Sequence, residues 1–160
     1  MLLAAAALAS AAAASAALSP TAYHAAADAA CTQAKTHIRA LAGKTSQNPA
    51  KVERYRAAEL VIEGREYATL RALEPPASLL APHRRALWDL WLAYVHDTRY
   101  VQDLKAGEGL LAATKDAYAG FDGIAVLMDQ DKAWTQAGAS ACVAGGISGH
   151  VKVKTHATIP

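Results

Sequence analysis

Residues 80–104 read LAPHRRALWDLWLAYVHDTRYVQDL, and this stretch decides the fold class of the chain. Its apolar residues recur three or four positions apart, from Leu80 to Leu104, which is the spacing of one helix face. Trp88 and Trp91 widen that face into a broad apolar arc. Such an arc indicates either the central core helix of a bundle or, in part, an exposed docking surface. We favour the core interpretation, because an alanine-rich bundle has few other bulky side chains to fill it.

Three further segments carry the same helical spacing, at residues 21–42, 49–73 and 110–137. Asn48-Pro49 supplies an N-cap followed by proline at the first helical position, and Pro75-Pro76 ends the helix that starts there. Four helices joined by short loops predict an all-α fold, an antiparallel up-down-up-down four-helix bundle over residues 21–143. Residues 144–160 have no helical period and are expected to form a flexible tail.

The composition supports one helical domain. The chain has 160 residues, which suits a single core, and about a quarter of them are alanine while only 6% are aromatic. A β-sandwich or barrel needs more β-branched and aromatic residues. The formal net charge of +2 lacks the concentrated positive charge of nucleic-acid binders, so neither DNA nor RNA is an expected partner.

The first twenty residues predict export. Residues 2–19 are apolar or small throughout, and Ala14-Ser15-Ala16 resembles a signal-peptidase cleavage site. We therefore expect residues 1–20 to be a signal peptide and the protein to be secreted or extracytoplasmic. An uncleaved N-terminal anchor is the alternative, and the protein would meet a membrane only in that case.

The two cysteines, Cys31 and Cys142, predict a disulfide. An even pair in an exported chain, without a metal-ligand spacing, usually forms a bridge, and two free buried thiols are the alternative. The bridge would close a loop of about 110 residues. This lowers the entropy of the unfolded chain, and the chain-entropy model predicts that the folded state is stabilised by roughly 4 to 5 kcal/mol as a result.

Short motifs along residues 23–142 resemble a family of small secreted actinobacterial proteins of uncharacterised function. The resemblance rests on the following elements: Tyr23, Asp28 before Cys31, Leu70-x-x-Leu73-x-Pro75-Pro76, His83 with Leu87 after it, and Ala141-Cys142. It implies an exported helical bundle with a disulfide, and it implies no activity.

Six histidines raise the possibility of a metal site, but no pair has the i, i+4 spacing of a helical zinc motif. His83 lies on the apolar face of its helix, and residues 49–73 offer Glu59, Glu63 and Glu66 across the Pro-Pro hinge. We expect His83 and Glu66 to form a buried polar pair that satisfies hydrogen bonds in the core. We assign no catalytic, metal-binding or cofactor-binding residue and expect no cofactor.

These features predict an exported, non-enzymatic helical-bundle protein of the cell envelope with a binding or structural role. The expected partner is an unknown envelope component or small ligand. The alternative is a small metal-binding or hydrolytic protein that uses His83 with the glutamates of residues 49–73.

Overall fold

The computed structural model describes residues 17–41 and 46–143, and every regular element within them is helical. The all-α prediction is confirmed. The elements are α1 (Pro20–Arg39), α2 (Pro49–Arg71), the 3-10 turn η1 (Ala77–Leu79), α3 (Leu80–Lys105), α4 (Leu110–Ala117), α5 (Gly123–Ala137) and the 3-10 turn η2 (Ser140–Cys142). The expected tail at residues 144–160 and most of the expected signal peptide, residues 1–16, lie outside the described residues.

Side-chain caps start the first two long helices. The Ser19 hydroxyl accepts a hydrogen bond from the Ala22 amide, and the Asn48 side chain accepts from the amides of Ala50 and Lys51. Proline follows each cap, where its missing N–H costs nothing. The predicted start of α2 at Asn48-Pro49 is therefore confirmed.

The helix predicted at residues 110–137 is two helices. The chain turns between Ala117 and Gly123, where Gly120 has a φ of 72° that glycine adopts without strain. The Asp122 side chain then caps α5 by accepting from the Ala125 amide. His96 of α3 donates from Nδ1 to the Ala117 carbonyl at 2.7 Å, which satisfies the end of α4. Contacts with α3 thus fix a break that helical spacing alone does not reveal.

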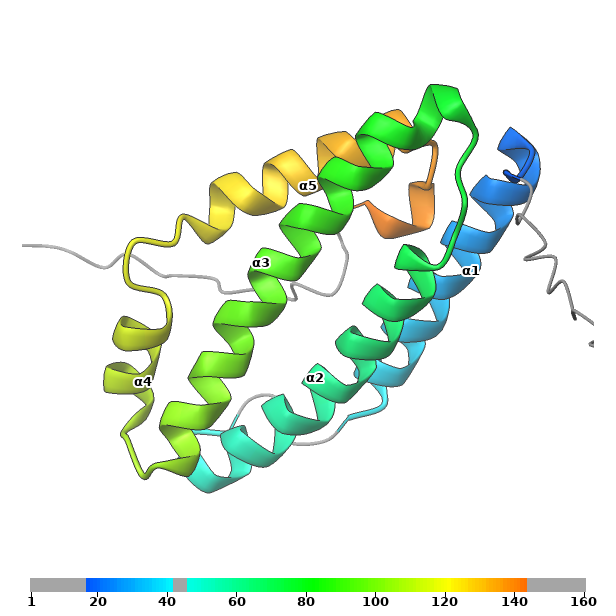
Figure 1. Ribbon diagram of the computed structural model, residues 1–160. Coiled ribbons are helices and arrows are strands. Elements are labelled where there is room, and N and C mark those ends of the chain that lie inside the picture. Colours follow the sequence, from blue (N-terminus) through cyan, green and yellow to red (C-terminus); the bar gives the residue numbers. More distant parts are fainter. Residues whose placement is uncertain (1–16, 42–45, 144–160) are drawn as a thin grey trace, which may run out of the picture.

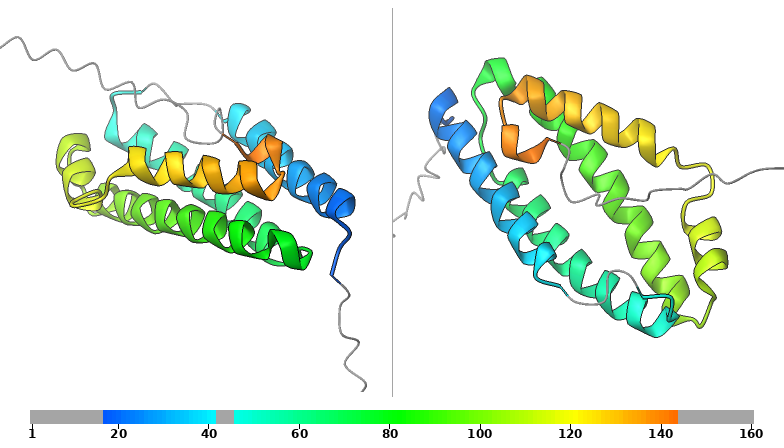
Figure 2. Two further views of the ribbon diagram at one scale, coloured as in Figure 1. Left: turned by 90° about the horizontal axis from the view of Figure 1, so that it is seen from above. Right: turned by 180° about the vertical axis from the view of Figure 1, so that it is seen from behind.

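Figure 1 shows α3 lying between α2 and α5, with α1 on the far side of α2. Turning the molecule shows η2 next to α1 (Figure 2), so the end of the described chain returns to its beginning. The main core joins α1, α2, α3, α5 and η2 around small side chains and a few large ones, chiefly Tyr23, Leu70 and Trp134. A second, smaller cluster packs α3 against α4 around Tyr100 and Leu104.

The disulfide expected between Cys31 and Cys142 is present at bonding distance, with Cα atoms 5.2 Å apart and a sequence separation of 111. Two side chains of α1 hold the same turn. Asp28 accepts from the Ala141 amide at 2.7 Å, and Lys35 donates to the carbonyl oxygens of Ala141 and Val143. One face of α1 therefore binds η2 covalently and through hydrogen bonds.

We expected the apolar arc of α3 to lie in the core, and this prediction is wrong for the two tryptophans of the arc. Trp88 is 53% exposed and Trp91 is 37% exposed, with ring centroids 5.1 Å apart. The core is instead filled by Trp134 of α5, which is 1% exposed, and by close alanine packing. Small residues let the helices approach, so the bundle needs fewer large side chains inside than we expected.

Candidate functional site

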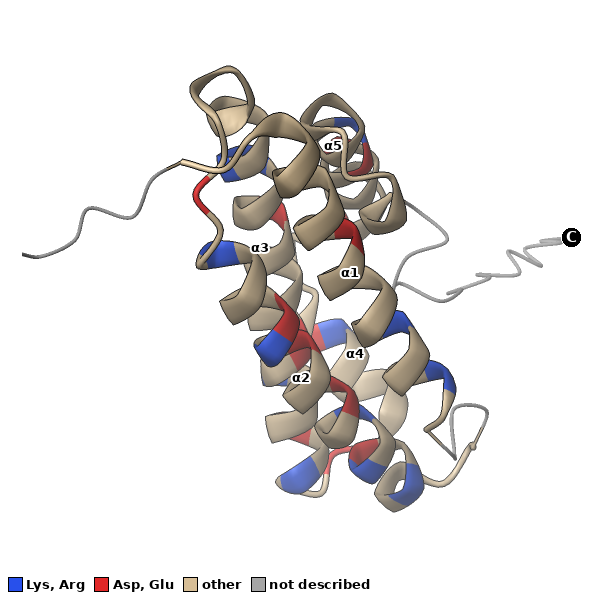
Figure 3. Ribbon diagram, turned by 90° about the vertical axis from the view of Figure 1, so that its right-hand side faces the viewer, with Lys and Arg blue, Asp and Glu red and all other residues tan. Residues whose placement is uncertain are grey.

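An unusual feature of α2 is that its buried face is largely acidic. The buried residues of this helix are Tyr55, Glu59, Glu63, Glu66 and Leu70, spaced three or four apart. The three glutamates are 4%, 8% and 6% exposed. Glutamate is almost never fully buried unless it is paired, because taking a carboxylate out of water is costly. Figure 3 shows acidic and basic positions interspersed along α2.

The first glutamate of this face is paired. Glu59 accepts from the Arg56 guanidinium at 2.6 Å and from the Tyr55 hydroxyl at 3.2 Å. Both carboxylate oxygens therefore have donors, and the charge of Glu59 is compensated. This part of the face needs no ligand to explain it.

The other two glutamates are not paired in this way. Among the described residues no hydrogen bond reaches the Glu63 carboxylate, and Oε2 of Glu66 is buried without a partner. Burial raises the pKa of Glu66 to about 8, against a smaller opposing effect of the Lys35 charge. Burial also raises the pKa of Glu63 well above its usual range, and the nearby charges of Asp97 and Glu59 raise it further.

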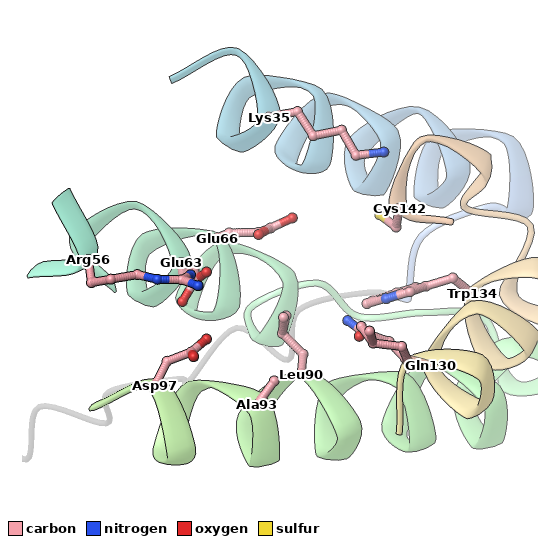
Figure 4. A pocket seen from close by; sticks show the side chains of 11 residues that line it. Lys35, Arg56, Glu63, Glu66, Leu90, Ala93, Asp97, Gln130, Trp134 and Cys142 are labelled. Atoms are coloured by element: carbon pink, nitrogen blue, oxygen red, sulfur yellow. The ribbon is translucent and has the colours of Figure 1, made fainter. Parts of the chain in front are cut away.

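Both carboxyl groups line a cavity of about 80 Å³ enclosed by four helices and η2. Figure 4 shows the side chains that reach it from α1, α2, α3 and α5. The lining residues are Lys35, Arg56, Glu63, Glu66, Leu90, Ala93, Asp97, Leu127, Gln130, Trp134 and Cys142. We call this cavity the interior cleft.

Position in the fold explains why the interior cleft is there. Helices α1, α2, α3 and α5 contact one another in that order, and η2 joins α5 back to α1. The cleft lies inside this ring, and Cys142 of the disulfide forms part of its wall. The Cys31–Cys142 disulfide therefore helps both to close the ring of helices and to form the wall of the cleft.

His83 and Glu66 do not form the pair we expected. Both are buried, at 3% and 6% exposed, but Nδ1 of His83 hydrogen-bonds to the Tyr23 hydroxyl at 2.8 Å. Its ring also meets Trp134 edge to face, with centroids 6.0 Å apart. The pKa of His83 is lowered by burial and by the Arg84 charge, so the neutral ring is favoured. His83 is a core residue with a different partner, and Glu66 belongs to the cleft.

Sequence reasoning placed the α2 glutamates near the core but missed the other polar residues of the cleft. Asp97 lies on α3 and accepts a hydrogen bond from the Tyr118 hydroxyl, while Gln130 lies on α5. A signal for α2 was available, since Glu59, Glu63 and Glu66 continue the spacing of Tyr55 and Leu70. No comparable signal pointed to Asp97 or Gln130, because each sits among polar neighbours in the sequence.

Two features are absent from the described ranges, residues 17–41 and 46–143. No three His, Cys, Asp or Glu side chains there are grouped closely enough to hold a metal ion. No helix in the same ranges is long and apolar enough to cross a membrane.

Comparisons of the chain with protein-family models, curated proteins and solved structures found no match.

Proposed function

We propose that this chain is an exported helical-bundle protein whose interior cleft binds a small polar ligand. One observation carries the proposal: Glu66 is 6% exposed, and its Oε2 faces the cleft with no partner. A buried polar atom in a folded protein normally has a partner, so an unmet acceptor beside a cavity marks a place where a ligand can bind.

The cleft favours binding over catalysis. Its described lining residues include no histidine, serine or threonine, so the usual pairing of a nucleophile with a general base is absent from them. His83, on which the metal-binding and hydrolytic alternative depended, hydrogen-bonds to Tyr23 instead.

Export to the cell envelope remains part of the proposal. It is supported by the apolar first twenty residues and by the Cys31–Cys142 bridge, since such bridges persist in oxidising compartments. Membership of the family of small secreted actinobacterial proteins is likewise a proposal, and it rests on the short motifs between Tyr23 and Cys142. N-terminal sequencing of exported material should find a start near Pro20, and an intact Met1 would contradict cleavage.

For the topology, we propose an antiparallel four-rod bundle in which α4 and α5 together form the fourth rod. Short connections between successive long helices support this arrangement, as does the return of η2 to α1. In such a bundle ligand sites lie between facing helices, which is where the interior cleft is found.

A thermal panel tests the binding function. Small amines, carboxylates, sugars, phosphate and divalent cations are added separately at millimolar concentration, and the melting temperature of the oxidised protein is recorded. At least one class should raise it, because a ligand that binds only the folded state stabilises that state. Ala93→Leu, which fills the cleft from α3, should abolish the response, while the matched change Ala112→Leu on the exposed side of α4 should keep it.

Two results would overturn the proposal. In the first, no class of compound raises the melting temperature of the unmodified chain. In the second, Ala93→Leu responds as strongly as the unmodified chain does.

A further inference from the structure

The charged side chains around the interior cleft differ in whether they already have hydrogen-bond partners. Its two cationic side chains already have partners: Lys35 donates to the carbonyl oxygens of Ala141 and Val143, and Arg56 donates to Glu59. Oε2 of Glu66 has no such partner, and Glu63 accepts no hydrogen bond among the described residues, although the Arg56 charge lies close enough to lower its pKa in part. The groups left available to a ligand are therefore acceptors with negative charge when ionised.

The opposite side of the cleft carries one charged residue, Asp97 of α3, which already accepts from the Tyr118 hydroxyl, and is otherwise uncharged. Its uncharged residues are Leu90 and Ala93 of α3 with Leu127, Gln130 and Trp134 of α5. In Figure 4 the Trp134 indole and the Gln130 side chain extend from α5 toward the glutamates of α2. An indole face attracts a cation, and a glutamine side chain offers a further oxygen acceptor.

We infer that the cleft binds the primary ammonium group of a small amine. This inference rests on the binding function proposed above. A primary ammonium group carries three N–H donors and a positive charge, and the cleft offers the carboxylates of Glu63 and Glu66 and the amide oxygen of Gln130. Charge-assisted hydrogen bonds of this kind are stronger than neutral ones.

The size of the cleft sets a limit on the ligand. Its volume is about 80 Å³, roughly half of the engineered cavity of about 150 Å³ that holds a benzene molecule. An ammonium group with one or two carbons fits this space. A larger amine, such as a lysine side chain of a peptide, would enter by its charged end only.

A divalent metal ion fits the cleft less well than an amine. Metal ions need several oxygen ligands converging within about 2.0 to 2.6 Å. In the described part of the chain no three acidic or metal-binding side chains converge in this way. An amine makes longer hydrogen bonds and tolerates acceptors that are farther apart.

Binding of an amine should release a proton. Glu66 shares the cleft with Lys35 from α1, Glu63 and Arg56 from its own helix and Asp97 from α3, while the lining residues of α5 are all uncharged. Burial holds the pKa of Glu66 near 8, so most molecules carry its proton at pH 7. Because the ammonium group prefers the ionised carboxylate, affinity should rise with pH.

The test is an NMR titration of the oxidised chain with ethylammonium chloride at pH 6, 7 and 8, followed through the Trp134 indole N–H. We expect saturable shifts and an apparent affinity that rises with pH, by up to about tenfold per pH unit for each carboxyl group that loses its proton on binding. Tetramethylammonium, which has no N–H donor, and sodium chloride should give no saturable shift. Nα-acetyllysine methylamide distinguishes a peptide-borne amine from a free one.

Glu66→Gln is the decisive variant, because the amide has nearly the same shape without the charge. It should weaken ethylammonium binding at least about tenfold and reduce its pH dependence to what Glu63 alone contributes, since the charge-assisted bond to Glu66 is lost. Asp116→Asn on the exposed side of α4 should bind like the unmodified chain. Melting curves of both variants confirm that they are folded.

The outcomes separate the two proposals. If another class of compound binds in the thermal panel and no amine does, the amine inference falls and the binding function stands. If Glu66→Gln binds ethylammonium as tightly as the unmodified chain, the inference is also wrong. If nothing binds, both proposals fall.

Discussion

At the residue scale, Glu66 has an environment that departs from that of an ordinary glutamate. It is buried, lacks a partner for Oε2 and has a pKa raised to about 8 by burial. Its carboxyl group therefore keeps a proton in the folded state at a pH where the unfolded chain has lost it. That difference makes the stability of the folded state depend on pH.

The sign of this dependence gives a first prediction. A raised carboxyl pKa means that the Glu66 contribution to stability falls as the pH rises from about 4.5 to about 8. Glu66→Gln should therefore leave stability nearly unchanged at pH 5 and raise it by about 1 to 3 kcal/mol at pH 8. Urea unfolding of both proteins across this range measures the effect. Equal stabilities at pH 8 would show that Glu66 is ionised and solvated.

A second prediction concerns the buried hydrogen bond between Tyr23 and His83. Tyr23→Phe removes the hydroxyl and leaves Nδ1 of His83 without its partner, which should lower stability by about 1 to 3 kcal/mol. Tyr67→Phe is the matched control, since within the described residues its hydroxyl makes no hydrogen bond. The urea concentration at the midpoint of unfolding is measured for both variants. Equal decreases would show that the Tyr23–His83 hydrogen bond does not contribute to stability.

At the element scale, helix ends account for most of what could and could not be predicted. Asn48-Pro49 marked the start of α2 because its capping chemistry is local to the sequence. The break between α4 and α5 was missed because it depends on α3. His96 bonds the Ala117 carbonyl and stacks on Phe121, with ring centroids 4.0 Å apart. A contact between positions twenty or so residues apart leaves no trace in helical spacing.

The end of α5 carries a third prediction. Gly138 has a φ of 72°, and a Cβ added there would lie 2.3 Å from Nε2 of His24. Gly138→Ala should cost about 1 to 2 kcal/mol for the backbone, and more for displacing His24. Gly120→Ala shares the φ of 72° but meets no atom within 4 Å, so it isolates the backbone cost. Thermal unfolding should rank Gly138→Ala as the less stable, and the reverse order would refute the contact.

At the scale of the whole molecule, the ring of helices is closed by η2 and the disulfide. Sequence alone predicted the bridge, because two cysteines leave only one possible pairing. It did not predict the interior cleft, because a cavity depends on how four helices meet. It also gave His83 the wrong partner, since residues at the same level of neighbouring helices need not face each other.

Removing the bridge gives a fourth prediction. Replacing both Cys31 and Cys142 by alanine should lower the free energy of unfolding by about 2 to 4 kcal/mol, because the unfolded chain gains the freedom of a loop spanning 111 positions. Since Cys142 lines the cleft, ligand-induced stabilisation should fall as well. Denaturant unfolding of oxidised and double-alanine protein tests both effects. Unchanged stability would mean that η2 is held by Asp28 and Lys35 alone.

The central claim is that α2 presents a buried, unpartnered carboxyl group to a cleft inside the bundle. A ¹³C NMR pH titration of the Glu66 side-chain carboxyl in the ligand-free oxidised protein tests it most directly. The account predicts a midpoint near 8, far above that of an exposed glutamate. A midpoint near 4.5 would place this carboxyl in water and contradict both the cleft and the function proposed for it.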